Sequence, residues 1–196
     1  AYAVGFTTIL FGKGQVFAYR LLPLLVGLLS LSFLAIAFAK TLGVRHAAAI
    51  FLVILQVPMF TNMMHGLCYH GYWMSLWLAE IGVLALVFLR PGHVRRAHLV
   101  ALAALAFVNG WFDYEAVFLV SLSAIPFWLL SDDWRSPERR RDAWQCLLAC
   151  CAGFGLAHVL HIMQVASYLG GLHEALADLA RAGKKRTGGN TWMKFP

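Results

Sequence analysis

Long apolar blocks, separated by short polar segments, constrain this chain more than any other feature. Six such blocks are predicted as helices, at residues 16–39, 47–60, 71–89, 97–108, 116–130 and 143–162. Crossing the hydrocarbon core takes about 17–25 residues of helix, so the second and fourth blocks need flanking residues. Only 13% of all residues are charged and 61% are hydrophobic, whereas soluble domains carry about 25% charged residues. We therefore expect an all-α fold, a polytopic integral membrane helix bundle with about six transmembrane helices.

The segments between these blocks alternate in charge, and this predicts their orientation. Segments 61–70 and 109–115 contain no Lys or Arg. The segments after the first, third and fifth blocks are basic, with Lys40, Arg45, Arg90, Arg95, Arg96, Arg135, Arg139, Arg140 and Arg141. By the positive-inside rule the basic segments are cytoplasmic. The formal net charge of +7 thus reflects membrane topology, and nucleic acid is not expected as a partner because no soluble basic face would carry it.

A different pattern follows the last block. Four leucines recur at helical spacing opposite charged residues, which predicts an amphipathic helix on the outer membrane interface. They are Leu169, Leu172, Leu176 and Leu179. This helix is expected to end at Gly183, before the cations Lys184, Lys185 and Arg186. We expect residues 1–164 to form the bundle, as a fragment of a larger membrane domain, and residues 165–196 an extracytoplasmic helix with a basic tail.

Polar and aromatic side chains gather in the predicted outer segments. Asp113 and Glu115 begin the fifth block, either as a functional carboxylate pair or as a plain helix cap. His158 and His161 share one face of the sixth block. They are candidate metal ligands together with His65 and His70, or they form hydrogen bonds between helices. The Lys184–Arg186 run is either a site for a lipid phosphate or a solvated charge cluster.

Glu80 lies in the middle of the third block. An ionised side chain at that depth costs roughly 2.5–3.5 kcal/mol, so we expect the carboxyl to be protonated or paired. The cysteines at positions 146, 150 and 151 lie inside one apolar block and are expected to act as small buried hydrophobic residues.

Part of the chain resembles a known enzyme family. The string YRLLPLLVGLLSL at residues 19–31, followed by AKTLGVR at residues 39–45, is similar to the second membrane helix and first cytoplasmic turn of GT-C membrane glycosyltransferases. The branch concerned is related to dolichyl-phosphate-mannose–protein mannosyltransferases. QVPMF at residues 56–60, HGY at residues 70–72 and DYE at residues 113–115 stand where relatives close a helix near a proline or carry polar groups. The resemblance covers roughly residues 17–130 and more loosely 158–179.

The resemblance implies an enzyme that transfers a sugar from a polyprenyl-phosphate-linked donor on the extracytoplasmic face. Enzymes of this family invert the configuration at the anomeric carbon of the sugar. They use a carboxylate base in the first outer loop, often beside a divalent metal. This chain has no Asp or Glu before Glu80, so we expect that base upstream of Ala1. The candidate catalytic residues are Asp113 and Glu115, and the candidate metal ligands are His65, His70, His158 and His161. The candidate donor contacts are Tyr69, Tyr72, Trp111, Lys184, Lys185 and Arg186.

Two other classes of protein are alternatives to the enzyme. A transporter would use Glu80 and the histidines, but the internal repeat typical of many transporters is not found. A non-catalytic membrane subunit would use small residues such as Gly153 and Gly155 to pack against partner proteins. In every case we expect the lipid bilayer as a partner and a bacterial inner (plasma) membrane as the location.

Overall fold

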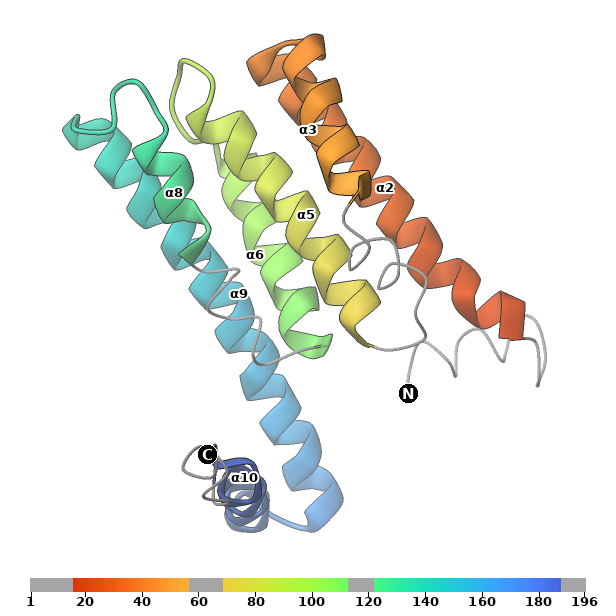
Figure 1. The fold of residues 1–196 in the computed structure, drawn as a ribbon. Coiled ribbons are helices and arrows are strands. Elements are labelled where there is room, and N and C mark those ends of the chain that lie inside the picture. The colour runs from red at the N-terminus through yellow and green to blue at the C-terminus, as the bar shows by residue number, and fades with distance from the viewer. Residues whose placement is uncertain (1–15, 57–68, 113–121, 188–196) are drawn as a thin grey trace, which may run out of the picture. The chain divides into compact units, whose positions relative to one another are not determined.

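The computed structural model describes residues 16–56, 69–112 and 122–187, and helices make up nearly all of these ranges (Figure 1). The all-α prediction is confirmed for the described residues. They contain α2 (Val16–Leu42), α3 (Val44–Gln56), α5 (Tyr69–Phe88), α6 (Arg96–Phe112), α8 (Ala124–Leu129), α9 (Pro137–Leu169) and α10 (Leu172–Thr187). The chain forms two compact units, Ala1–Gly155 and Leu156–Pro196, and each is described by itself.

Helices α2 and α3 form a tight hairpin that turns at one glycine. Gly43 has φ +86°, a left-handed conformation that glycine adopts with little strain. The Ala47 amide donates to the Gly43 carbonyl at 3.1 Å, so α3 begins directly after the turn. As a result Arg45, which was expected in a loop, lies in the first turn of α3. The two helices pack against each other.

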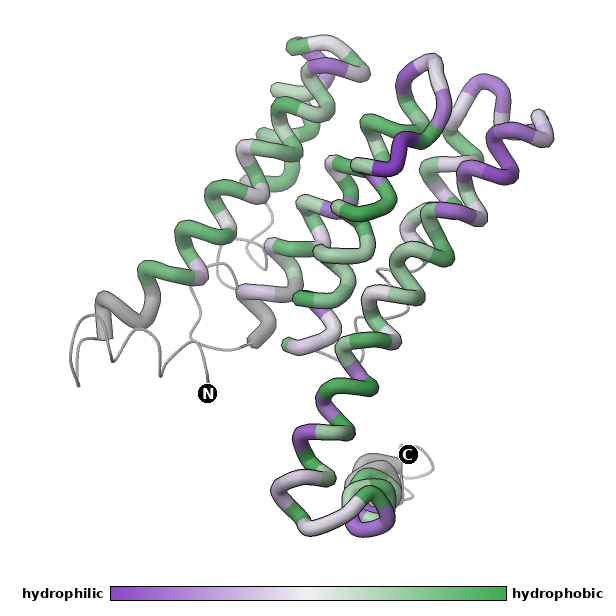
Figure 2. Tube along the Cα trace, turned by 180° about the vertical axis from the view of Figure 1, so that it is seen from behind, coloured by the Kyte–Doolittle hydropathy of each residue, from purple (hydrophilic) through white to green (hydrophobic). Residues whose placement is uncertain are grey.

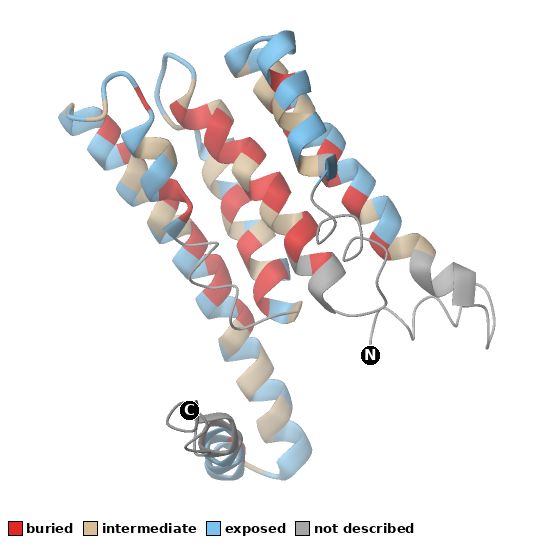
Figure 3. Cartoon of the chain, viewed as in Figure 1, coloured by how far each residue is buried: buried red, intermediate tan, exposed pale blue. Residues whose placement is uncertain are grey.

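Helix α5 is the central helix of the first unit. It packs against α2, α6 and α8, and its residues are buried along most of its length (Figure 3). A helix that is apolar on all faces needs neighbours on all faces, and α5 has them. On the α2 side Leu78 joins a cluster with Leu31 and Leu34. On the other side Leu84 and Phe88 enter the core shared with α6, α8 and α9.

Helices α6 and α9 approach each other closely at a glycine. A Cβ atom on Gly153 of α9 would lie 2.0 Å from the Ala103 carbonyl oxygen of α6. Small residues permit such approaches between helices. Cys146 and Cys150 of α9 fill the same core as free, buried thiols, which confirms the interpretation of these two as small hydrophobic residues. Cys151 is exposed, so the prediction was wrong there.

The three basic segments meet at one end of the first unit. These are the turn at Gly43, residues 89–95 and residues 130–136, all at the upper end of the unit in Figure 1. Figure 2 shows hydrophilic residues concentrated at the same ends of the helices and hydrophobic residues along their middle stretches. The arrangement is consistent with the charge alternation noted in the sequence.

By length and composition, two of the described helices could cross a membrane, namely Leu21–Leu42 within α2 and the whole of α9. The segments Val44–Ile54, Met74–Phe88 and Arg96–Phe112 are apolar but shorter. Helix α8 has six residues, and residues 116–121 of the predicted fifth block lie outside the described ranges. The structure therefore gives an all-helical protein with two candidate spans, and the six-span count stays a prediction.

The outward faces of the first unit are apolar. Leu28, Leu29 and Ile36 of α2 are each more than half exposed, and so are Trp144 and Leu148 of α9. Large apolar side chains exposed in this way are typical of faces that another apolar phase or a partner covers. It is what a helix presents to lipid.

The second unit holds the end of α9 and the amphipathic helix α10. The chain turns at Gly170, which has φ +90°. Ala175 is fully buried, whereas Leu172 and Leu176 are exposed. Helix α10 does not end at Gly183 as predicted but continues to Thr187. The three cations Lys184–Arg186 therefore lie within the helix.

The Gly153 contact predicts a sharp difference between two neighbouring glycines. Replacing Gly153 with Ala should destabilise the protein by about 1–3 kcal/mol, because the new methyl group would collide with the Ala103 backbone. Thermal unfolding of the detergent-purified protein measures this. Gly155→Ala is the matched control: nothing lies within 4 Å of its Cβ position, and helix propensity favours Ala by about 1 kcal/mol. Equal stability of the two variants would contradict the close α6–α9 contact.

Candidate functional site

The most unusual side chain in the described part of the chain is Glu80, on the central helix α5. Its exposed fraction is 0%. Neither carboxyl oxygen meets the geometry of a hydrogen bond with a described partner. An unpaired charge is rarely tolerated inside a helix bundle, because transferring it from water costs several kcal/mol. A carboxyl group retained at such a buried position is therefore a candidate functional residue.

Polar groups from neighbouring helices surround Glu80. The Asn109 amide of α6 is near enough to influence the carboxyl, and Asn109 is itself 0% exposed. The Cys150 thiol of α9 also interacts with Glu80 electrostatically. Elsewhere along α5 the Trp77 indole donates to the Ser123 hydroxyl at 2.9 Å. Glu80, Asn109 and Cys150 thus form a small polar cluster of neighbouring groups among the apolar faces of α5, α6 and α9.

This cluster contains no described cation that would neutralise the carboxylate. Glu80 was expected to be protonated or paired; within the described residues it has no salt bridge, and its polar neighbour is the Asn109 amide. A neutral carboxylic acid and an amide can exchange a hydrogen bond, and the acid can release or accept a proton. The arrangement can thus clamp α5 to α6 or hold a proton inside the bundle. Hydropathy placed Asn109 in an outer loop, but α6 continues through it to Phe112, so its role was missed.

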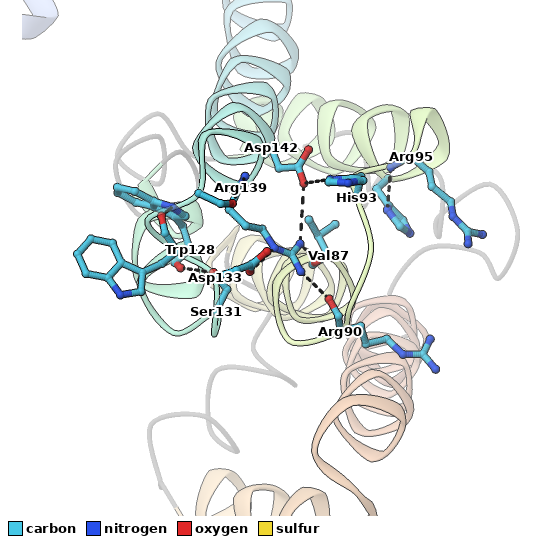
Figure 4. A network of polar contacts seen from close by, with 12 residues as sticks. Val87, Arg90, His93, Arg95, Trp128, Ser131, Asp133, Arg139 and Asp142 are labelled. Carbon is cyan, nitrogen blue, oxygen red and sulfur yellow. Dashed lines mark hydrogen bonds and ion pairs between the residues drawn. The ribbon is translucent and has the colours of Figure 1, made fainter.

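A second polar network closes the basic end of the first unit (Figure 4). Arg139, 3% exposed, donates from Nε to Asp133 Oδ1 at 2.7 Å, from Nη1 to the Val87 carbonyl at 2.9 Å and from Nη2 to the Arg90 carbonyl at 2.8 Å. Asp142 Oδ2 lies 3.8 Å from Arg139 Nη1. The sequence had grouped Arg139 with exposed loop cations. It is instead a buried structural residue that binds the C-terminal end of α5.

A polar pocket of about 460 Å³ lies beside this network. Its walls come from the ends of α2 and α5 and from the segment before α9, with Thr41, Arg90, Asp132 and Asp133 as polar members. Because it sits at the basic end, it is distinct from the outer site predicted from the sequence. Among its charged lining residues, Arg139 and Asp133 form an ion pair.

The residues predicted for the outer site are distributed as follows. His65, Asp113 and Glu115 lie outside the described residues. Tyr69 and His70 begin α5, His158 and His161 lie on the part of α9 that belongs to the second unit, and Lys184, Lys185 and Arg186 lie in α10. The structure thus positions the backbone of these residues but does not test their roles. They stay predictions.

Two of the predicted aromatic contacts have described side chains. Tyr72 is buried and stacks on Phe112, with ring centroids 4.7 Å apart and an interplanar angle of 6°. One face of its ring is therefore occupied by protein. Trp111 is 37% exposed and touches Phe107 with centroids 6.1 Å apart. Of the two, Trp111 is better placed to meet a ligand. The start of α5 and the end of α6 come together through the Tyr72–Phe112 stack.

Within the described ranges no group of three or more His, Cys, Asp or Glu side chains could hold a metal ion. The predicted metal set includes His65, which lies outside the described residues, so the metal stays a prediction. No family model matches the chain, and no curated protein or solved structure shows significant similarity to it.

The contact between Glu80 and Asn109 can be tested with a double-mutant cycle. Asn109→Leu should cost about 1–3 kcal/mol beside Glu80, because it leaves the buried carboxyl without its amide neighbour. The same change should cost clearly less in a Glu80→Leu background, since replacing both partners with apolar groups can be nearly neutral. The free energy of unfolding in mixed micelles gives the coupling, expected to be about 1 kcal/mol.

A distant residue provides the control for this cycle. The Thr41 hydroxyl bonds to carbonyls of its own helix, Ala37 at 3.0 Å and Phe38 at 3.3 Å. Thr41→Val should therefore be additive with Glu80→Leu. Additive behaviour of Asn109→Leu as well would mean that the two buried polar groups do not interact.

Proposed function

We propose that this chain is the membrane domain, or part of it, of a glycosyltransferase that takes its sugar from a polyprenyl-phosphate-linked donor on the extracytoplasmic face. The observation that carries the proposal is that the two ends of the first unit differ in the residues they carry. Three basic segments lie at one end, and α5 begins and α6 ends at the other. That opposite end carries Tyr69, His70 and Trp111 and leads directly into Asp113 and Glu115.

The proposal includes about six membrane spans. At 1.5 Å per residue, the 20 residues of α5 extend about 30 Å, the thickness of a hydrocarbon core. The 17 residues of α6 extend about 25 Å. A slightly longer or less tilted helix would span the hydrocarbon core. Helix α3 and the region around α8 need residues beyond the described ranges. Their apolar composition over 47–60 and 116–130 supports such extensions.

The proposed chemistry divides two tasks among the outer residues. The acceptor hydroxyl attacks the anomeric carbon and loses its proton to the carboxylate base that the resemblance implies, and Asp113 and Glu115 are the candidate catalytic residues of the outer pocket within this chain. The departing lipid phosphate needs charge stabilisation, and Lys184, Lys185 and Arg186 supply cations for it. A divalent metal, if bound, would supply the same stabilisation. His158 and His161 suit such a role in one respect, since they lie three positions apart on α9 and their side chains share a face.

The Glu80 cluster favours a second candidate function, proton-coupled transport. A fully buried carboxyl beside an amide, inside the helix bundle, is the kind of group that proton relays use. The two functions separate experimentally. Glu80→Gln should leave sugar transfer intact under the first proposal and abolish proton-coupled uptake under the second.

The topology can be checked independently of any activity. Reporter fusions after Arg95 and after Arg140 should report the cytoplasm, because both follow basic segments. Fusions near Tyr69 and Trp111 should report the outer side. One fusion on the wrong side would break the proposed six-span register.

The transfer reaction can be tested with the full-length protein in liposomes, using radiolabelled polyprenyl-phosphate mannose as the probe. Asp113→Asn should lower kcat by about 10²–10⁴-fold with little change in donor KM, if the carboxylate acts on the proton in the transition state. Replacing Lys184, Lys185 and Arg186 with Gln should raise the donor KM about tenfold or more, because each cation near a lipid phosphate contributes roughly 1 kcal/mol.

A control variant lies at the opposite end of the first unit. Asp132→Asn removes an exposed carboxylate there and should transfer sugar at the wild-type rate. Full activity of the Asp113 and the Lys184–Arg186 variants would remove these site assignments. No transfer by the wild-type protein, with its topology intact, would retire the enzyme proposal.

A further inference from the structure

An apolar groove runs between α8 and α9 in the first unit. Its volume is about 330 Å³, at the low end of the roughly 300–1,000 Å³ typical of small-molecule sites. The apolar walls are formed by Ala124, Ile125, Trp128, Ala143, Trp144 and Leu147, and Arg140 completes the lining. Ile125 and Trp144 are exposed. The groove therefore opens to the surroundings of this unit and not toward the buried Glu80 cluster.

Arg140 places one positive charge at the basic end of this groove. It lies in the first turn of α9, directly after segment 130–136. Its neighbour Arg139 is committed to Asp133 and to two carbonyl groups. The guanidinium of Arg140 is exposed, and within the described ranges no carboxylate or carbonyl engages it. A cation without a partner among the described residues is therefore available at the end of the apolar groove.

The groove wall on the α8 side is held in place by specific contacts. The Trp128 indole donates to the Trp134 carbonyl at 2.7 Å, and the two rings meet edge to face with centroids 6.0 Å apart. The Ser131 hydroxyl donates to the Trp128 carbonyl at 2.6 Å. These bonds keep the indole from collapsing into the space. The groove is therefore preformed, and a ligand would pay little to order it.

We propose that this groove binds one acyl chain of an anionic phospholipid, with the lipid phosphate on Arg140. The apolar walls match a hydrocarbon chain, and the guanidinium matches a phosphate, to which it can donate two hydrogen bonds. Basic pockets between membrane helices on the cytoplasmic side hold anionic headgroups in this way. The inference rests on the membrane placement in the proposed function and is independent of the sugar chemistry.

Other occupants fit the groove less well. A partner helix is about 10–12 Å across with its side chains, too wide for a space of this volume, and would not need a cation at one end. A free phosphate would leave the apolar walls uncovered. The polyprenyl donor of the proposed function would act at the opposite end of the unit. A phospholipid of the cytoplasmic leaflet satisfies the charge and the apolar surface together.

The test compares phosphatidylglycerol with phosphatidylcholine of the same acyl chains. The full chain is purified, placed in nanodiscs containing both lipids, and the lipids retained on the protein are counted by native mass spectrometry. We expect the wild type to retain phosphatidylglycerol preferentially. Arg140→Gln should lower this preference about fivefold, in line with one basic residue at the surface. Arg141→Gln, an exposed neighbour that does not line the groove, should leave it unchanged.

Two further arms identify what occupies the apolar part. Ala143→Phe fills the groove and should reduce retention of both lipids, with an unchanged elution profile on gel filtration as the folding check. Glycerol phosphate, the headgroup without chains, should not compete. Equal losses in the Arg140 and Arg141 variants, competition by glycerol phosphate, or full retention by a folded Ala143→Phe variant would each overturn the inference. Preferential retention without sugar transfer would retire only the proposed function.

Discussion

The buried guanidinium of Arg139 holds the basic end of the first unit together. The last carbonyl groups of a helix have no partners within it, and those of α5 lie inside the protein. Arg139, from the first turn of α9, supplies donors to the carbonyls of Val87 and Arg90. Asp133 and Asp142 balance its charge. One side chain thus joins the end of the central helix to the start of the helix that packs beside it.

Two buried ionisable groups of the described residues, Arg139 and Glu80, have different surroundings. The guanidinium of Arg139 is tolerated at its buried position because carboxylates and carbonyls accept its hydrogen bonds, and a buried ion pair is stable only when its donors are satisfied. Glu80 lies amid apolar side chains with an amide as its polar neighbour. The first arrangement fixes geometry at a helix end. The second leaves a group that can change its protonation without breaking a salt bridge, which is why Glu80 and not Arg139 suits a functional role.

Much of the helical architecture could be predicted from the apolar blocks alone, because a helix satisfies its own backbone whatever surrounds it. The helix ends could not. Hydropathy ends a helix where side chains become polar, yet α5 already includes Tyr69 and His70, and α6 continues through Asn109. Backbone hydrogen bonds do not depend on side-chain polarity, so helices extend into polar surroundings. The helix end predicted at Gly183 was wrong because one glycine destabilises a helix by only about 1 kcal/mol.

The candidate site was predictable in part. Glu80 stood out because a charge within an apolar block is expensive, and the structure buries it completely. Its partner Asn109 was missed, because partners come from other helices and their phase is not visible in one block. The outer carboxylates, histidines and cations come from separate segments of the chain. Only packing between those segments can join them into one site, and the spacing of residues along a sequence contains no such information.

The run of arginines at the start of α9 shows where a closer reading of the pattern would have helped. Successive residues on an α-helix point about 100° apart. Arg139, Asp142, Cys146 and Cys150 follow one another at steps of three and four residues, and all four are buried. Arg140 is one step out of phase and is exposed at the α8–α9 groove. Identical side chains therefore perform different tasks, one tying helices together and the other facing the surroundings, because the helix turns between them.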